Sequence, residues 1–372
     1  MDGYELRSEI LSSGAKYYVQ STLVPAQRMI VTSLFHEGNL LSKQNETYDP
    51  AIDDDRLRTL VRRLHEERKS RITSLFDIRE SLKKEADARA HLKLGDAFYR
   101  QKLFKESMAE VIRSIKLGAE TSEAYAILGN CLLALGDHDK ALKAFHKGIE
   151  ISPEYPDLFN ALGLTYLKME RCRDAVDSFD RALALNAYYQ DAHLNLALAL
   201  ARNVILKQDY DLSRGLKSRL KEILDKNLQL KPSLETEDFR AAMAAVDVER
   251  YDVVCEKLSD VKRELERTAD SDLSLELYLI LKFRAHELTE EEIDRSIERL
   301  KLEMDASPGF ADLQNDLGIL YTAKCKILID KAHQAFEGAL AINRSFRKAE
   351  KNLKLTANDR QGIHFLLKAL LD

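Results

Sequence analysis

One short stretch of the sequence has the residue types of a catalytic metal site. His65, Glu66 and Glu67 stand together in "LHEERK", and a histidine followed by a glutamate on a helix begins the zinc-protease pattern. That pattern needs a second histidine four residues after the first, so that both imidazoles face one ion. Position 69 is Lys69. We therefore interpret this stretch as a solvated helix face.

The carboxylates and thiols of the chain do not form a metal site either. Asp53, Asp54 and Asp55 are adjacent, but they lack the spaced oxygen ligands and the glycine of a calcium loop, so we interpret them as the start of a helix. The cysteines are too far apart in the sequence to pair as close ligands, and we expect reduced, mostly buried thiols. They are Cys131, Cys172, Cys255 and Cys325.

No other motif points to catalysis. Phosphate-cradling loops, a nucleophile elbow and paired cysteine ligands are all missing from the sequence. Four of the histidines fall in helical patterns, where we expect them on the surface or lining a groove: His91, His138, His146 and His193. We therefore expect no catalytic residue, no metal and no cofactor, and hence a protein that is not an enzyme.

Composition narrows the remaining classes. The chain has 372 residues, of which 45% are apolar and 32% charged, with 6 prolines, as in a folded, helix-rich protein. Its net charge of -5 is spread along the chain without a long basic stripe, which disfavours a nucleic-acid partner. The first residues lack the apolar core of a signal peptide, and no run of eighteen apolar residues occurs. We expect a cytoplasmic protein without a membrane span.

A Leu-Gly pair recurs with a period of 34 residues. Glycine inside a helix is less favourable than alanine by about 1 kcal/mol, so its recurrence needs a reason. A small residue follows each glycine by twelve positions, and an aromatic or branched residue follows by sixteen. We expect the glycine and the small residue to lie where two helices cross closely. The aligned residues are Gly95, Ser107 and Val111; Gly129, Ala141 and Phe145; Gly163, Ala175 and Phe179.

This 34-residue pattern resembles the tetratricopeptide repeat, with its Leu-Gly pair, small residue, Phe and closing Pro. The pattern fits best at Leu128, Gly129, Ala141, Phe145 and Pro153, and residues 88–191 as a whole fit well. The resemblance implies a mainly α fold, a right-handed α-α superhelix of stacked helical pairs. We expect about seven pairs.

The regular repeats occupy residues 86–235 in this interpretation, the fourth with a loop insertion near 205–211. Residues 236–372 are then degenerate repeats with closing helices at 345–356 and 359–371. Leu317, Gly318, Tyr321, Ala332 and Phe336 renew the repeat pattern late in the chain. The apolar end "GIHFLLKALLD" either packs on the last repeat or contacts another chain.

Residues 1–85 predict a separate N-terminal module. Stretches 16–24, 28–38 and 39–49 are rich in Val, Ile, Thr and Tyr and are divided by Pro25-Ala26 and Gly38, as in a three-stranded antiparallel meander. A helix of about 28 residues begins at the aspartates and extends from the sheet to the first repeat. The module caps the solenoid, or its free strand edge pairs with a second chain or a partner strand. This organisation resembles that of uncharacterised bacterial tetratricopeptide proteins.

The family resemblance also implies a binding surface, because the first helix of each pair lines a concave groove that takes a peptide or helix. We expect the asparagines to bind ligand main chain and the leucines to form apolar pockets, although the asparagines have the alternative of joining helix to helix. The expected groove residues are Leu92, Asp96, Tyr99, Ala126, Asn130, Leu133, Asn160, Leu164, Leu167, Leu194, Asn195 and Leu198.

One specialisation of the family does not fit. Relatives that grip a terminal carboxylate have a lysine, an asparagine and further basic residues in the groove, whereas this chain has Leu92, Asp96, Asp157 and Ala161 there. A ligand with apolar and basic groups suits these residues better. We therefore expect a non-enzymatic adaptor that binds a protein partner. The alternative is a self-assembling scaffold, a homo-oligomer formed through the sheet edge or the last helix.

Overall fold

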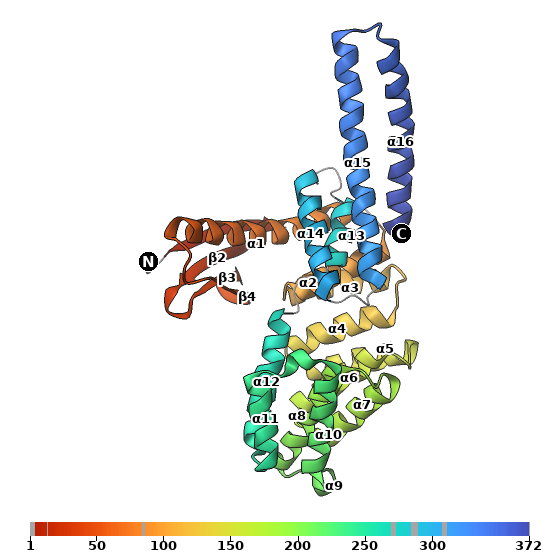
Figure 1. The fold of residues 1–372 in the computed structure, drawn as a ribbon. Coiled ribbons are helices and arrows are strands. Elements are labelled where there is room, and N and C mark those ends of the chain that lie inside the picture. The colour runs from red at the N-terminus through yellow and green to blue at the C-terminus, as the bar shows by residue number, and fades with distance from the viewer. Residues whose placement is uncertain are drawn as a thin grey trace. The chain divides into compact units, whose positions relative to one another are not determined.

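The computed structural model describes residues 4–12, 14–83, 86–268, 273–283, 289–306 and 311–371. The chain divides into two compact units, residues 1–270 and residues 271–372, which we describe one at a time (Figure 1). The first unit holds an N-terminal sheet, a long helix and five helical pairs among its described residues. The described residues of the second unit form four helices and the short connections at their ends.

The N-terminal sheet has four antiparallel strands in the order β1-β2-β3-β4, one more than the sequence predicts. Their bounds are Glu5–Ser12 (β1), Ala15–Val24 (β2), Met29–His36 (β3) and Asn39–Thr47 (β4). The last three are the predicted meander. Strand β1 alternates charged Glu5, Arg7 and Glu9 with inward Leu6, Ser8 and Ile10, and this alternation is the signal that our prediction missed.

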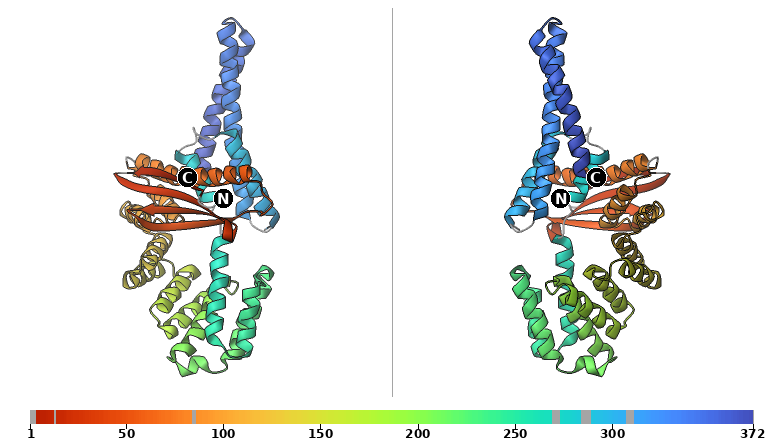
Figure 2. Two further views of the ribbon diagram at one scale, coloured as in Figure 1. Left: turned by 90° about the vertical axis from the view of Figure 1, so that its left-hand side faces the viewer. Right: turned by 90° about the vertical axis from the view of Figure 1, so that its right-hand side faces the viewer.

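One long helix, α1 (Asp54–Leu82), covers one face of the sheet (Figure 2). It begins as predicted, because the Asp53 carboxylate accepts a hydrogen bond from the Arg56 amide and so caps the helix. Its inner face buries Leu57 and Val61 against Leu23 and Ile30 of the sheet.

His65 corrects our interpretation of the "LHEERK" stretch as solvated. Its side chain is only 2% exposed, and its two ring nitrogens hydrogen-bond to Ser8 Oγ at 2.8 Å and Ser21 Oγ at 3.0 Å. Glu66 and Glu67 on either side of the inner stripe point into solvent. Burial lowers the pKa of His65 below its ordinary value, since the imidazolium loses hydration there. The histidine is a satisfied core residue of the N-terminal module.

The following helices form pairs in which each helix packs on its partner and on the next pair. Four pairs are α2/α3, α4/α5, α6/α7 and α8/α10, with the one-turn helix α9 before α10. Their bounds are Ala88–Arg100 (α2), Phe104–Lys116 (α3), Ser122–Ala134 (α4), His138–Ile151 (α5), Pro156–Lys168 (α6), Cys172–Leu185 (α7), Gln190–Leu206 (α8), Tyr210–Ser213 (α9) and Leu216–Leu230 (α10).

The repeated glycines lie where the paired helices cross, as predicted. A Cβ atom added to Gly95 would lie 2.6 Å from Val111 Cγ2, and one added to Gly163 would lie 2.6 Å from Phe179 Cε1. The small residue twelve positions later is buried each time, and Ser107 Oγ even donates a hydrogen bond to the Gly95 carbonyl at 2.7 Å. Closer packing thus offsets the low helix propensity of glycine.

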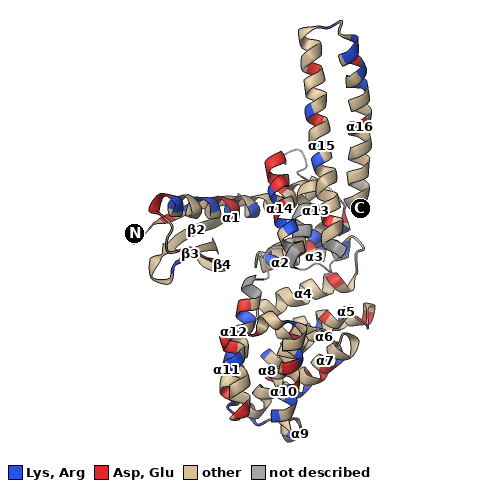
Figure 3. Cartoon of the chain, viewed as in Figure 1, with Lys and Arg blue, Asp and Glu red and all other residues tan. Residues whose placement is uncertain are grey.

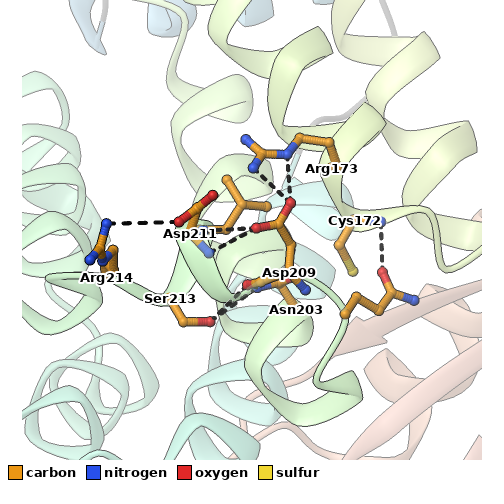
Figure 4. Close-up of polar contacts among 9 residues, drawn as sticks. Cys172, Arg173, Asn203, Asp209, Asp211, Ser213 and Arg214 are labelled. Carbon is orange, nitrogen blue, oxygen red and sulfur yellow. Dashed lines mark hydrogen bonds and ion pairs between the residues drawn. The ribbon is translucent and has the colours of Figure 1, made fainter.

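The connection between α8 and α10 is fixed by a dense polar network (Figure 4). Asn203 is fully buried; its amide donates to the Asp209 carbonyl at 2.7 Å, and its Oδ1 accepts from the Asp209 amide at 3.0 Å. Asp209 caps α9 and forms an ion pair with Arg173 of α7. In addition, Gln208 accepts a hydrogen bond from the Cys172 amide. The extra residues of this repeat are therefore held against the preceding pair.

The fifth pair, α11 (Glu237–Asp247) and α12 (Tyr251–Thr268), continues the first unit but departs from the repeat arrangement. Helix α12 packs along α8. As a result, every residue from Ala192 to Ala201 is buried. A helix that is apolar on all sides needs such cover on all sides.

The second unit contains α13 (Leu273–Phe283), α14 (Glu290–Ala306), α15 (Ala311–Ile342) and α16 (Arg347–Leu371). Two predictions are wrong here. The residues from Leu317 to Phe336, expected to form two helices, lie in the single 32-residue helix α15. The two closing helices expected at 345–356 and 359–371 are one helix, α16, which packs antiparallel to α15.

The glycines explain why the late copy of the repeat pattern does not fold as a repeat. A Cβ atom at Gly318 would meet nothing within 4 Å, unlike one at Gly163. None of the described helices crosses closely at Gly318. The Leu-Gly pair there matches the repeat in sequence but lacks the close helix packing of the repeats.

Replacing these two glycines by alanine should therefore have different effects. We expect Gly163→Ala to lower the free energy of unfolding by about 1–3 kcal/mol, because the new methyl group overlaps the Phe179 ring. Gly318→Ala is the matched control in another Leu-Gly pair, and it should leave stability unchanged or raise it by up to about 1 kcal/mol. Urea unfolding followed by circular dichroism measures both. Equal losses in the two variants would contradict the packing argument.

The buried His65 should make stability fall in mild acid. Its folded pKa lies below the ordinary 6.5, so the unfolded chain takes up the proton first. Its contribution is complete above pH 6.5 and is lost as the pH falls from there through the folded pKa. We expect His65→Gln to flatten the decrease in Tm between about pH 7 and about pH 5. His146→Gln, on the exposed face of α5, is the control; a His65→Gln slope equal to that of wild type would refute this assignment.

Candidate functional site

The first helices of the pairs, α2, α4, α6 and α8, contact one another in succession. All twelve predicted groove residues lie on these four helices, but their exposure divides them into two groups. Seven are partly exposed and form what we name the open face: Asp96, Tyr99, Ala126, Asn130, Leu133, Leu164 and Leu167. Five are buried: Leu92, Asn160, Leu194, Asn195 and Leu198.

The buried residues of the fourth repeat correct the prediction that this part of the groove is open. Leu198 lies in one apolar cluster with Val254, Leu258 and Val261 of α12. The thiol of Cys255, also on α12, lies 4.0 Å from the Leu198 carbonyl oxygen. Helix α12 therefore covers the face of α8 that we expected to receive a ligand.

Two of the three asparagines are bound within the chain. Asn195 Nδ2 donates to Asn160 Oδ1 at 2.8 Å, and Asn195 Oδ1 accepts from the ammonium of Lys262 on α12. Asn160 Nδ2 in turn donates to the Tyr189 hydroxyl at 3.3 Å. These amides join α6, α8 and α12, which was the alternative interpretation, and they are not available to a ligand. No hydrogen bond of the Asn130 side chain is found within the described residues, and Asn130 is partly exposed.

Carboxylates and phenols of successive repeats lie near one another on this side. Burial raises the pKa of Asp96, and its ion pair with Arg100, at 3.2 Å, opposes that shift. Burial also raises the pKa of Tyr155, and the charges of Asp157, Glu123 and Asp96 add to the effect. Carboxylates from three repeats thus lie around Tyr155. Asp96 and Glu123 are paired with Arg100 and Lys93, so the exposed Asp157 is the carboxylate best placed to attract a positively charged group.

Two of the histidines expected on the surface or in a groove are instead buried between helices. His91 is 1% exposed and its Nδ1 lies 2.7 Å from Glu110 Oε2, while Arg79 of α1 donates to the other carboxylate oxygen at 2.8 Å. His193 is 4% exposed and hydrogen-bonds to the Ala187 carbonyl. Burial lowers the pKa of His193. Both have structural partners.

The possible metal ligands and cysteine thiols of the described residues do not point to a catalytic site. Within them, no group of three or more His, Cys, Asp or Glu side chains is arranged to hold a metal ion. Cys131 and Cys172 are buried free thiols, as expected, whereas Cys255 is partly exposed and Cys325 exposed. Burial raises the pKa of Cys131 to about 11, which makes its thiol a poor nucleophile. None of the described helices is both long and apolar enough to cross a bilayer.

Our sequence analysis missed the residues of α12 that contribute to this region, above all Lys262 and the apolar stripe of that helix. The signal was present in α8 itself. Residues 192–201 read "AHLNLALALA", which leaves no polar face for solvent and so requires a covering element on both sides.

Comparison with known families agrees with the helical pairs. A TPR repeat profile matches residues 129–170, and a tetratricopeptide repeat profile matches residues 160–216. The matched segments run from α4 into α10 and include the crossings at Gly129 and Gly163.

Two curated proteins are similar to parts of the chain. The tetratricopeptide repeat-containing protein trd-1 of Caenorhabditis elegans is 24% identical over 210 residues, which cover 51% of this chain and 27% of that protein. The BBSome complex member BBS4 of Bos taurus is 27% identical over 120 residues, covering 32% of this chain and 22% of that protein. The chain spans about a quarter of the length of these relatives.

Solved structures show limited likeness. The crystal structure of MamA has a TM-score of 0.37 at 20% identity and covers 45% of this chain and 94% of its own. YrrB, described as a TPR protein with an unusual peptide-binding site, has a TM-score of 0.34 at 15% identity, covering 63% and 94%. The family assignment therefore rests on the two profile matches and on the helical pairs with their glycine crossings. On these grounds the chain contains tetratricopeptide repeats, which the profiles place within residues 129–216.

Proposed function

We propose that this protein is a non-enzymatic adaptor that binds a partner helix or extended peptide on the open face of α2, α4 and α6. Tetratricopeptide repeats support a role in protein–protein interaction. The groove-binding step is our proposal, and one observation carries it: the corresponding face of α8 already holds an amphipathic helix of the same chain, α12.

The contacts of α12 indicate what such a face accepts. Val254, Leu258 and Val261 follow the spacing of one helix face and pack into the apolar cluster of α8. Lys262 places its ammonium on the Asn195 amide oxygen. In the fourth repeat, the surface of the first helix, α8, thus binds a helix that has an apolar stripe with a cation beside it.

The open face offers similar groups in the first three repeats. Leu133, Leu164 and Leu167 supply partly exposed apolar surface, and Asn130 supplies an amide. Asp157 is exposed on α6, and Asp96 lies nearby in the charge environment of Tyr155. We therefore propose a ligand with apolar anchors and at least one Lys or Arg.

Adding bulk and charge to the open face should abolish capture of such a partner. In the variant Ala126→Arg, Asn130→Arg, two positive side chains occupy one face of α4 and repel a basic ligand. We expect proteins that co-purify with the wild-type chain to be lost from this variant. The experiment compares tagged full-length proteins, with capture read out by mass spectrometry and folding by circular dichroism.

The matched control is Ala109→Arg, Ala184→Arg, which adds the same two charges at exposed positions of the second helices α3 and α7. It should retain the partners. If the open-face variant also retains them, or if both variants lose them equally, binding does not occur on this face.

A specific observation favours self-assembly as a second candidate. In the apolar end of α16, Leu367 is buried with Leu320 and Ala323 of α15, whereas Phe365 and Leu366 remain 60% and 50% exposed. Part of this segment thus packs within the second unit, and part is free to contact another copy.

Replacing Phe365 and Leu366 should test whether the exposed part of this segment contacts another copy. We expect Phe365→Ser, Leu366→Ser to convert an oligomer into a monomer without unfolding the chain, because neither side chain belongs to the core. Light scattering after size exclusion measures the mass of both proteins. A wild-type chain that is already monomeric at high concentration would rule out assembly through α16.

A further inference from the structure

The turn that joins α15 to α16 presents two large apolar side chains to solvent. Ile342 is 91% exposed and Phe346 is 44% exposed. The turn itself is ordered, since Asn343 Oδ1 accepts hydrogen bonds from the Ser345 amide at 3.1 Å and the Ser345 hydroxyl at 2.9 Å. Its backbone is also closed by a bond from the Phe346 amide to the Asn343 carbonyl. The apolar residues are therefore held on a defined turn at the end of the hairpin.

Basic residues lie on the α16 side of this turn and extend into α16 (Figure 3). We name residues 342–354 the hairpin tip. Its five cations are all exposed, and its single acidic residue, Glu350, pairs with Lys354 at 2.9 Å. The other four have no ion pair with any described residue. The five are Arg344, Arg347, Lys348, Lys351 and Lys354.

Cations elsewhere in the second unit are arranged differently. Lys326 and Arg360 share Asp330, at 3.1 Å and 2.6 Å, and Lys324 pairs with Asp294 at 2.5 Å. These pairs stabilise helix contacts within the unit. Among the cations that the structure describes in the second unit, those without an ion pair thus include a group of four at the tip.

We propose that the hairpin tip docks on a membrane surface that contains anionic phospholipid. The four unpaired cations contact the headgroups, and Ile342 and Phe346 enter the boundary between headgroups and acyl chains. Each Lys or Arg near such a surface strengthens binding about fivefold. Apolar residues beside the cations strengthen it further when they leave water and insert at the interface. The contact is peripheral and needs no membrane-spanning helix.

The dimensions fit this placement. Arg347, Lys348 and Lys351 lie within the first five residues of α16, a rise of about 6 Å at 1.5 Å per residue. The headgroup layer on one side of a bilayer is about 5–7 Å thick. The cations can therefore all reach headgroups while the turn at the end of the hairpin enters more deeply.

The apolar residues distinguish this surface from a site for nucleic acid or an acidic protein patch. Phosphate backbones are bound by cations and hydrogen-bond donors, and a 91% exposed isoleucine contributes nothing to such contacts. In an interfacial site the same residue gains free energy from leaving water. Because the whole chain has a net charge of -5, an anionic surface would attract the tip specifically.

Vesicle flotation with the full-length protein tests the proposal. We expect binding to phosphatidylcholine vesicles that contain phosphatidylserine, little binding to phosphatidylcholine alone, and weaker binding as salt rises. Charge reversal in Arg344→Glu, Arg347→Glu, Lys348→Glu, Lys351→Glu should lower the partition coefficient at least about 100-fold. Ile342→Ser, Phe346→Ser should lower it about tenfold with the charges intact.

A matched control reverses four exposed lysines of the first unit and so gives the same net charge. It is Lys43→Glu, Lys105→Glu, Lys116→Glu, Lys143→Glu, and it should bind nearly as wild type. The proposal is overturned if wild type does not bind anionic vesicles at low salt, or if the control loses as much as the tip variant. Binding to DNA through the tip without binding to vesicles, or an unchanged Ile342→Ser, Phe346→Ser variant, would overturn it as well.

Discussion

The structure of the first unit depends on one constraint: a helical pair of this kind cannot bury its apolar surface alone. Stacking the pairs covers the surfaces between them, and the close crossings at Gly95 and Gly163 let each pair approach its own partner. The constraint reappears at both ends of the array, where no further repeat is available. At one end the N-terminal module covers α2, and at the other α12 covers α8. Both ends are therefore closed by elements that are not themselves regular repeats.

The N-terminal junction combines apolar and polar contacts. The ring of Tyr17 on β2 lies 4.7 Å from that of Phe76 on α1, which lies 5.5 Å from that of Phe98 on α2. Beside this aromatic series, Glu110 accepts a hydrogen bond from Arg79 and contacts His91, and all three side chains are at most 23% exposed. Removal of one partner from such a group leaves buried charge uncompensated, which usually costs about 3–5 kcal/mol. The sheet is thus joined rigidly to the first repeat.

Sequence reasoning succeeded where one local pattern determines one local contact, and it failed where the contact partner is distant in sequence. The Leu-Gly period predicted the helix crossings, and Asp53 predicted the start of α1. In contrast, Gly318 has the same local pattern, but α15 continues without a break through the residues that follow, "KCKILIDK". The burial of Asn195 depends on Lys262 of α12, 67 residues later. The apolar residues 192–201 of α8 indicate that a cover is needed, but they do not indicate which segment of the chain supplies it.

The position of α12 on α8 has a consequence for competition. Because both helices belong to one chain, the concentration of α12 at that face is fixed by the connecting residues, and it does not fall when the protein is diluted. A ligand that extends from the open face onto α8 must displace a tethered helix and break the Lys262–Asn195 contact. A ligand confined to α2, α4 and α6 meets no such competitor. Under the proposed binding on the open face, a short partner is therefore favoured over a long one, by a margin that the chain's own sequence determines.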